Sequence, residues 1–358
     1  MKAAVMRDSK IVVDEISAPT PGSGEVLVKT LACGICGSDL HTLVHGHQMV
    51  KMSRETDGLF DMDLSRDVVM GHEFCGEILD YGPDTTGKLP VGTKVCAMPI
   101  LMRGGKLATV GYSNDAPGGF GQQMVLLESM LLPVTNGLDT ELAALTEPMA
   151  VGYHTVEMAR LQKDEVPLVI GCGPVGLAVI TALKLKGVGP IIAADFSPAR
   201  RKLAEQVGAD VVVDPGQNSP YQTWSDMARI EGAGASDNPF DTGPQTRQGV
   251  YFECVGVPGV IEQMIVGAPR GCRIVVVGLC MEEDQFMPYR AISKEINIQF
   301  VLGYGGEEFA TVLHNIAEGN VNVEPLITGK VGLDGVADAF NDLGDPEKHA
   351  KILVEPWR

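Results

Sequence analysis

The chain has 358 residues, 45% of them hydrophobic and 21% charged, which predicts a globular protein of two domains. The 46 acidic and 28 basic residues give a net charge of −18 at pH 7, which disfavours binding to nucleic acid or to an anionic membrane surface. No apolar run is long enough to span a bilayer, and the first residues lack the apolar core of a signal peptide. We therefore expect a cytoplasmic protein without a membrane partner.

The first 150 residues have the pattern of short strands separated by glycine- and proline-rich turns, which is typical of an antiparallel sheet. The strands are expected at 2–6, 11–15, 25–31, 77–81, 94–98 and 124–133. A long loop is expected at 42–69, where it could line a substrate pocket.

Within this part of the chain, Cys36 in the sequence GICGSDLH and His72 in the sequence GHE offer a thiolate and an imidazole, a pair that zinc favours. Two carboxylates, Glu73 and Glu147, are candidates for a third ligand, and the sequence leaves open which of them binds at rest. Cys33 and Cys36 also form a CxxC pair, but no thioredoxin-like βαβ pattern surrounds it. The eight cysteines are scattered along the chain and do not suggest a disulfide framework.

From about residue 165 the pattern changes to strands that alternate with helices, which predicts a doubly wound parallel sheet. Its six strands are expected at 166–171, 191–195, 210–214, 250–253, 273–278 and 296–302. One helix between them is expected to begin after Ser197-Pro198 and to end at Gly208. A glycine-, asparagine- and proline-rich stretch at 232–248 is expected to be a surface insertion.

A helix at 307–318 and a strand at 351–355 are expected to return to the first domain. The predicted organisation is therefore one domain of residues 1–153 and 303–358 and a second of residues 154–302. An apolar edge strand at 296–302 would be covered by a second copy of the chain, which predicts a homodimer or, by doubling, a homotetramer.

The sequence GCGPVG at 171–176 follows an apolar strand and opens a helix, which is the context of a dinucleotide-binding fingerprint. Gly171 permits the tight turn, Gly173 lets the backbone approach a pyrophosphate, and Gly176 allows the helix to pack closely on the strand. The start of the helix, with Pro174 and Val175, offers free N–H groups to phosphate.

Asp195 ends the next predicted strand, 19 residues after Gly176. A carboxylate there accepts hydrogen bonds from ribose hydroxyls and repels a 2′-phosphate, so NAD is favoured over NADP. Arg200 and Arg201 weaken this preference slightly, because a guanidinium can pair with a phosphate. Val255 and Val277 are further candidates for cofactor binding.

Taken together, these motifs resemble the zinc-dependent medium-chain dehydrogenase/reductase superfamily over nearly the whole chain. The resemblance includes Gly118-Gly119-Phe120-Gly121, Glu147-Pro148 and the C-terminal KILV at 351–354. It implies an α/β protein with a mostly-β GroES-like catalytic domain and a Rossmann domain with a six-stranded parallel sheet. The Glu147-Pro148 pair resembles the polyol and threonine dehydrogenase branch, in which a glutamate replaces a cysteine ligand.

The same resemblance implies that Ser38 bonds the substrate hydroxyl and that His41 passes its proton through the cofactor ribose to solvent. Many relatives hold a structural zinc through four closely spaced cysteines, but no other cysteine lies between Cys96 and Phe120 here. We therefore expect one catalytic zinc per chain and no structural zinc, and the lobe at 99–117 must be held by packing and hydrogen bonds.

The sequence thus predicts a zinc- and NAD-dependent oxidoreductase that interconverts a small secondary alcohol, diol or polyol and its ketone. Two alternatives remain: a zinc-free quinone or enone reductase of the same superfamily, and a nucleotide-binding protein that has lost catalysis. Cys36, His72 and Glu147 argue against the first, and the intact Ser38 and His41 against the second. The specific substrate and the physiological direction do not follow from the sequence.

Overall fold

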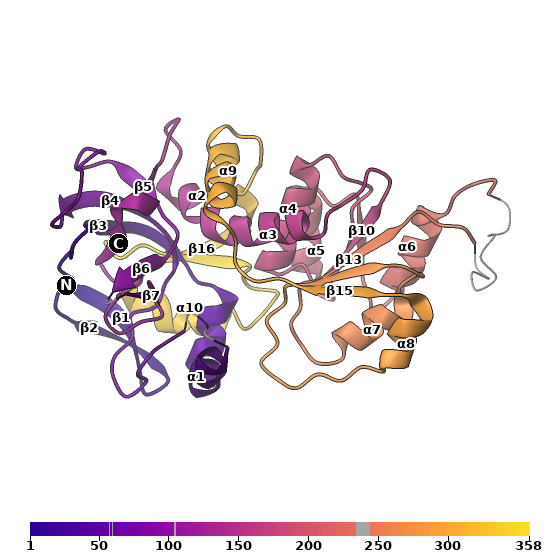
Figure 1. Ribbon diagram of the computed structural model, residues 1–358, viewed down its shortest axis with the longest axis horizontal. Coiled ribbons are helices and arrows are strands. Elements are labelled where there is room, and N and C mark those ends of the chain that lie inside the picture. Colours follow the sequence, from indigo (N-terminus) through magenta and orange to yellow (C-terminus); the bar gives the residue numbers. More distant parts are fainter. Residues whose placement is uncertain (57, 59, 104, 234–243) are drawn as a thin grey trace. The chain divides into compact units, whose positions relative to one another are not determined.

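The structure is a computed structural model, and it describes residues 1–56, 58, 60–103, 105–233 and 244–358. The chain forms two compact units (Figure 1). Met1–Pro148 and Gly306–Arg358 make up the first, the terminal unit, and Met149–Gly305 make up the second, the central unit. The mostly-β fold of the one and the parallel sheet of the other confirm the expected fold class.

The terminal unit is built on a seven-stranded sheet with the order β16-β17-β3-β4-β5-β9, in which β8 also pairs with β3. A separate hairpin, β1–β2, and a second small hairpin, β6–β7, complete its strands. The strands are β1 Lys2–Arg7, β2 Lys10–Glu15, β3 Glu25–Gly34, β4 Glu73–Tyr81, β5 Lys94–Cys96, β6 Ile100–Arg103, β7 Lys106–Thr109, β8 Gln123–Leu127, β9 Leu132–Pro133, β16 Ile327–Val331 and β17 Lys351–Val354.

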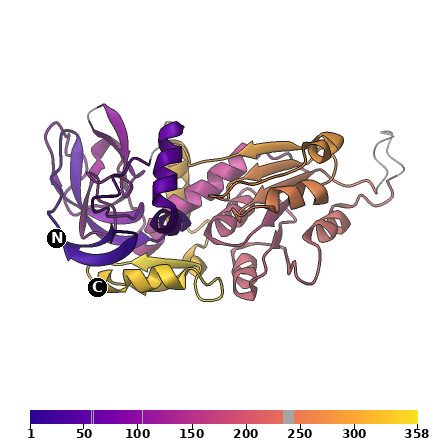
Figure 2. The same ribbon diagram turned by 90° about the horizontal axis from the view of Figure 1, so that it is seen from below.

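The C-terminal part of the chain returns to this unit, as the sequence predicted. Figure 2 shows the yellow C-terminal segment beside the indigo hairpin β1–β2. Strand β17 pairs antiparallel with β3, and the rings of Phe120 and Phe340 meet edge to face at 6.0 Å in the core. The sheet is not purely antiparallel, because β16 and β17 run parallel.

Helices connect these strands and cover the sheet. They are α1 Gly37–Glu55, α2 Thr140–Ala144, α3 Thr146–Met158, α9 Gly306–Ala317 and α10 Val336–Asp342, with short 3₁₀ turns η1 Glu128–Met130, η2 Glu324–Leu326 and η3 Leu333–Gly335. Helix α3 begins in the terminal unit and continues into the central unit.

The prediction of a loop over 42–69 was wrong for its first part, which belongs to α1. The helix contains no proline, and the Asp39 carboxylate accepts a hydrogen bond from the Cys36 N–H at its start. The helix bends at His45 (φ −116°, ψ 19°), next to Gly46, where a Cβ would lie 3.2 Å from Leu64. The predicted strand 124–133 was also wrong as one element, because η1 separates β8 from β9.

The central unit has a six-stranded parallel sheet with the order β12-β11-β10-β13-β14-β15. Figure 1 shows α4 above strands β13 and β15 and α7 and α8 below them, so helices cover both faces. The elements are β10 Val166–Ile170, α4 Pro174–Leu185, β11 Ile192–Ala194, α5 Pro198–Val207, β12 Val211–Val213, α6 Pro220–Ala228, β13 Gly249–Glu253, α7 Val260–Gly267, β14 Arg273–Val276, α8 Pro288–Lys294 and β15 Asn297–Phe300.

The helix start and stop signals in this unit act as the sequence predicted. The Ser197 side chain accepts a hydrogen bond from the Arg200 N–H, and Gly208 ends α5 with φ 120°. The predicted insertion at 232–248 lies partly outside the described residues, since 234–243 are not described. Within the described residues, no helix combines the length and apolar composition that crossing a membrane requires.

Candidate active site and nucleotide site

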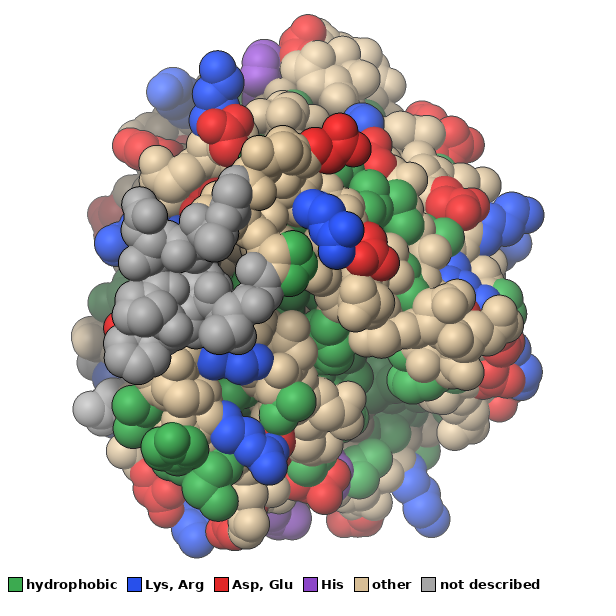
Figure 3. Space-filling model, turned by 90° about the vertical axis from the view of Figure 1, so that its right-hand side faces the viewer, with side chains coloured by type: hydrophobic (Ala, Val, Ile, Leu, Met, Phe, Trp, Pro, Cys, Tyr) green, Lys and Arg blue, Asp and Glu red, His purple; other side chains and the backbone are tan. Residues whose placement is uncertain are grey.

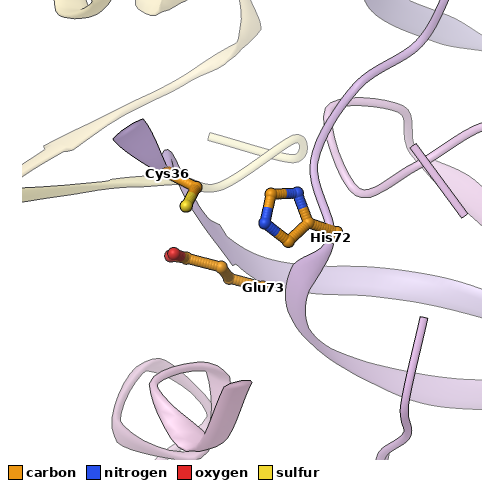
Figure 4. Close-up of side chains that lie close together, drawn as sticks. All are labelled: Cys36, His72 and Glu73. Atoms are coloured by element: carbon orange, nitrogen blue, oxygen red, sulfur yellow. The ribbon is translucent and has the colours of Figure 1, made fainter. Parts of the chain in front are cut away.

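Three potential metal ligands meet in the terminal unit. Ligand atoms of Cys36, His72 and Glu73 all lie within 4.8 Å of one another (Figure 4). Cys36 follows β3 and caps α1, His72 precedes β4, and Glu73 is the first residue of β4. The antiparallel register, which pairs Gly34 with Glu73, explains how segments far apart in sequence converge here.

Two glycines make this close approach possible. A Cβ at Gly34 would lie 2.0 Å from a carboxylate oxygen of Glu73. Gly71 has φ +100°, and a Cβ there would lie 2.7 Å from the ring of Phe120 and 2.9 Å from the sulfur of Cys33. A side chain at Gly34 would therefore collide with Glu73, and one at Gly71 would need a strained positive φ and would collide with Phe120 and Cys33.

Asp39 organises this cluster although the sequence analysis did not select it. Its buried carboxylate accepts a 2.9 Å hydrogen bond from the Cys36 N–H and lies 3.5 Å from Nδ1 of His72. Burial acts to lower the pKa of His72, but Asp39, followed by Cys36, more than offsets it and raises that pKa well above its ordinary value. A carboxylate behind an imidazole is the arrangement that orients a metal-bound histidine.

The donor set suits zinc. A sulfur, an imidazole nitrogen and carboxylate oxygens are the ligands that zinc binds in proteins. Nδ1 of His72 is buried and has no hydrogen-bond partner among the described residues, and its nearest counter-charge is Asp39. Nε2 is therefore the nitrogen that such an arrangement would leave for an ion.

Lys351 is the second residue of the site that the sequence analysis did not assign a role. Its ammonium donates hydrogen bonds to both carboxylate oxygens of Glu73, at 2.7 and 2.6 Å, and to the carbonyl of Ile35 at 2.9 Å. Both side chains are buried, with 1% and 0% of their surface exposed. Burial lowers the pKa of Lys351, but Glu73, Cys36 and Glu147 raise it by more.

Glu147, the other candidate ligand, is buried in the first turn of α3. It lies outside the group of three that meets within 4.8 Å, but its charge acts on Lys351. The structure thus brings Glu73 into the cluster and places Glu147 near it.

Ser38 and His41 lie on α1, in the first turns after the candidate ligand Cys36. The hydroxyl of Tyr112 lies 2.8 Å from Oγ of Ser38. His41 is half-buried, and burial together with the neighbouring His45, whose ring centre is 6.3 Å away, lowers the pKa of His41. A lowered pKa keeps this imidazole neutral, and so able to accept a proton, near neutral pH.

The lobe at 99–117, for which no structural zinc is expected, is held in part by charged contacts. The guanidinium of Arg103, on the hairpin β6–β7, donates two 2.9 Å hydrogen bonds to the carboxylate of Glu25. The Asn114 side chain bonds the backbone of Asp63 and Asp67 on the other side.

In the central unit, the glycine-rich turn has the backbone shape that the fingerprint requires. Gly171 has φ +93°, and a Cβ at Gly176 would lie 1.9 Å from the Gly171 carbonyl oxygen. Gly173 precedes Pro174 and Val175, the first residues of α4. The turn therefore leaves the start of α4 open to a phosphate.

Around this turn, the Asp195 carboxylate accepts hydrogen bonds from the N–H groups of Cys172 at 2.7 Å and Ser197 at 2.8 Å. The guanidinium of Arg200 lies beside Gly173, since its Nη1 would be 3.9 Å from a Cβ built there. The buried Nε of Arg200 has no hydrogen-bond partner among the described residues. Val255 follows β13 and packs against Gly171, and Val277 follows β14 and donates its N–H to the Glu253 carbonyl at 3.0 Å.

Comparison with known proteins places this architecture in a family. Residues 22–136 match the alcohol dehydrogenase GroES-like domain, and residues 174–318 match the zinc-binding dehydrogenase domain. An (R,R)-butanediol dehydrogenase from Bacillus subtilis is 31% identical over 367 residues, covering 99% of this chain and 100% of that protein. The chain belongs to the zinc-dependent medium-chain dehydrogenase/reductase superfamily.

Two further comparisons agree with this family membership. An L-threonine 3-dehydrogenase from Thermococcus kodakarensis is 30% identical over 358 residues, covering 96% of this chain and 94% of that one. The crystal structure of 2R,3R-butanediol dehydrogenase from Bacillus subtilis matches this dehydrogenase-family chain with a TM-score of 0.81 and 30% identity, covering 99% of each. The resemblance inferred from the motifs is thereby confirmed.

Proposed function

We propose that the chain is a zinc-dependent NAD(H) oxidoreductase that interconverts a secondary alcohol, diol or polyol and its ketone. The meeting of Cys36, His72 and Glu73 within 4.8 Å carries the proposal, because the rival quinone or enone reduction needs no such cluster. The glycine-rich turn of the central unit supports it, since it fits the pyrophosphate of a hydride-carrying cofactor.

Cys36 and His72 would hold one zinc ion per chain, with a carboxylate as the third ligand. When bound, the ion would act as a Lewis acid that favours ionisation of an alcohol hydroxyl. Both oxygens of Glu73 already accept hydrogen bonds from Lys351, so the charge of Glu73 is largely neutralised. This favours Glu147 as the resting third ligand and Glu73 as its close neighbour.

Ser38 and His41 would move the alcohol proton. Oγ of Ser38 would accept a hydrogen bond from the substrate hydroxyl. As the substrate proton moves onto Oγ, the serine proton would leave towards the half-buried imidazole of His41, further along α1, which releases it to solvent. The lowered pKa of His41 suits this task, because a neutral imidazole is needed to take up the proton.

The cofactor is proposed to be NAD. Gly171, Gly173 and Gly176 with the N-terminus of α4 would bind the pyrophosphate. Asp195 stands at the end of the following strand. Its carboxylate would accept hydrogen bonds from the ribose hydroxyls, and its negative charge would repel a 2′-phosphate. Arg200, with its unpaired Nε, would lie against the adenosine side of the cofactor, and Val255 and Val277 would contact it from the neighbouring strands.

The proposed substrate is a small alcohol such as a vicinal diol, in line with the name of the butanediol dehydrogenase relative. The test is formation of NADH by the zinc-loaded protein with a panel of secondary alcohols, vicinal diols, sugar alcohols and hydroxy amino acids. We expect NADH to form with at least one of these four classes of alcohol. Quinone or enone reduction that persists in Cys36→Ala, without alcohol oxidation, would establish the zinc-free alternative instead.

A homodimer formed through β15 is also proposed. This strand is at the edge of the parallel sheet, and Phe300 and Leu302 at its end are 63% and 83% exposed. Hydrophobic side chains also gather on part of the face shown in Figure 3. Tyr289 and Ile292 of α8 are further exposed apolar residues of the central unit. Light scattering should give a mass of at least two chains, and a monomer would refute the proposal.

A further inference from the structure

Tyr112 connects the lobe at 99–117 to the proposed proton acceptor. Its hydroxyl lies 2.8 Å from Oγ of Ser38 and 2.8 Å from Oδ1 of Asp39, and only 2% of the residue is exposed. The ring of Phe60 meets the Tyr112 ring edge to face at 4.7 Å, and the His72 ring lies 5.0 Å away. Tyr112 is thus held from several sides with its hydroxyl in the site.

The backbone turns this side chain inwards. Gly111 has φ +89°, and a Cβ there would lie 3.0 Å from the carbonyl oxygen of Gly71, the residue before His72. The Tyr112 N–H donates to the Thr109 carbonyl at 3.0 Å. The lobe is therefore packed directly against the segment that carries the ligands.

Counting protons shows the direction of the two hydrogen bonds. A tyrosine hydroxyl has one proton, and an ionised carboxylate only accepts. Tyr112 therefore donates to Asp39, and Ser38 donates to Tyr112. At rest the Ser38 proton points at Tyr112, so the lone pairs of Ser38 Oγ remain free to accept a hydrogen bond from a substrate hydroxyl.

We propose that Tyr112 is a positioning residue that holds the Ser38 hydroxyl in the orientation in which it accepts the substrate proton. This inference rests on the function proposed above. Without the Tyr112 hydroxyl, Ser38 is free to occupy other staggered rotamers, most of which turn Oγ away from its present place. Tyr112 itself exchanges no proton with the substrate.

The test is a double-mutant cycle of Tyr112→Phe with Ser38→Ala, read as kcat and KM for alcohol oxidation. Tyr112→Phe keeps the ring but removes the hydroxyl. It should lower kcat by about tenfold, because one hydrogen bond to Ser38 is lost, and leave KM for NAD unchanged. In the Ser38→Ala background the second substitution should have no further effect. Product accumulated over hours makes even strongly reduced rates measurable.

Independent effects that multiply in the double variant would overturn the proposal, because Tyr112 would then act on the lobe and not through Ser38. An unchanged kcat in Tyr112→Phe would overturn it as well. Tyr81→Phe is the matched control: its hydroxyl bonds the Leu89 carbonyl in the same unit, away from the cluster, and its loss should leave kcat unchanged. Absence of alcohol oxidation in the wild type would instead refute the proposed function.

Discussion

The ammonium of Lys351 and the carboxylate of Glu73 form a buried ion pair, with Nζ 2.6 and 2.7 Å from the two oxygens, between residues 278 positions apart in the chain. The pair joins the last strand of the terminal unit to the first residue of β4, beside Cys36 and His72. It thereby places a positive charge behind the candidate metal ligands Cys36 and His72.

Loss of the Lys351 charge should destabilise the protein strongly. In Lys351→Met the Glu73 carboxylate stays buried without a partner, and the free energy of unfolding should fall by about 3–5 kcal/mol. Denaturant unfolding measures this. Lys330→Met, which removes a half-exposed partner of Glu141, is the control and should cost at most about 1 kcal/mol. Equal stability of both variants would show that the buried pair is not needed.

The two candidate carboxylate ligands should differ in their effect on zinc affinity. In Glu147→Gln the proposed third ligand is lost, and in Glu73→Gln only a neighbour of the ligands is changed, which typically costs 10–100-fold in affinity. Competition with a chelator should therefore strip zinc from Glu147→Gln at a lower chelator concentration than from Glu73→Gln. The reverse order would make Glu73 the resting ligand.

The acid limb of the pH–rate profile should report the protonation of His41. Its neutral form accepts the proton, and its pKa lies below the ordinary 6.5, so oxidation should lose rate only as the pH falls below that value. Burial and His45 both lower this pKa. In His45→Gln the repulsion from His45 is absent, the pKa of His41 rises, and the acid limb should move to higher pH. A limb that stays in place would show that the two histidines are not coupled.

Asp195 should determine the choice of cofactor. Asp195→Ser removes the charge that repels a 2′-phosphate, whereas Arg200 remains to pair with one. The ratio of kcat/KM for NAD to that for NADP should fall by about tenfold or more, equivalent to about 1.4 kcal/mol. Asp214→Ser, which removes the charge of a half-buried partner of Arg201, is the control for charge alone. An unchanged ratio in Asp195→Ser would remove the basis for preferring NAD.

The alternation of strands and helices and the glycine-rich turn were accessible from the sequence because local patterns determine them. A β-branched run followed by GCGPVG and a helix requires no knowledge of distant residues, and neither do the Ser197 cap and the Gly208 stop. Cys36 and His72 could likewise be selected by residue type and spacing. Helix α1 was missed because its apolar residues do not gather on one face.

The residues that support the ligands were missed for a different reason. Lys351 reaches Glu73 across 278 residues and Tyr112 reaches Ser38 across 74, so no local pattern indicates either contact. Asp39 could have been recognised, because it stands three residues after Cys36, where a carboxylate bonds the N-cap backbone. Its proximity to His72 depends on the pairing of β3 with β4 and only the fold reveals it.

The most direct test of the proposed chemistry is a zinc titration of the metal-stripped protein, followed by NADH formation from a vicinal diol such as 2,3-butanediol. We expect no activity without metal, full activity at one zinc ion per chain, and none at any zinc concentration in Cys36→Ala, which should still bind NADH. Full activity of the stripped protein, or of Cys36→Ala, would contradict a metal-assisted oxidation at Cys36 and His72.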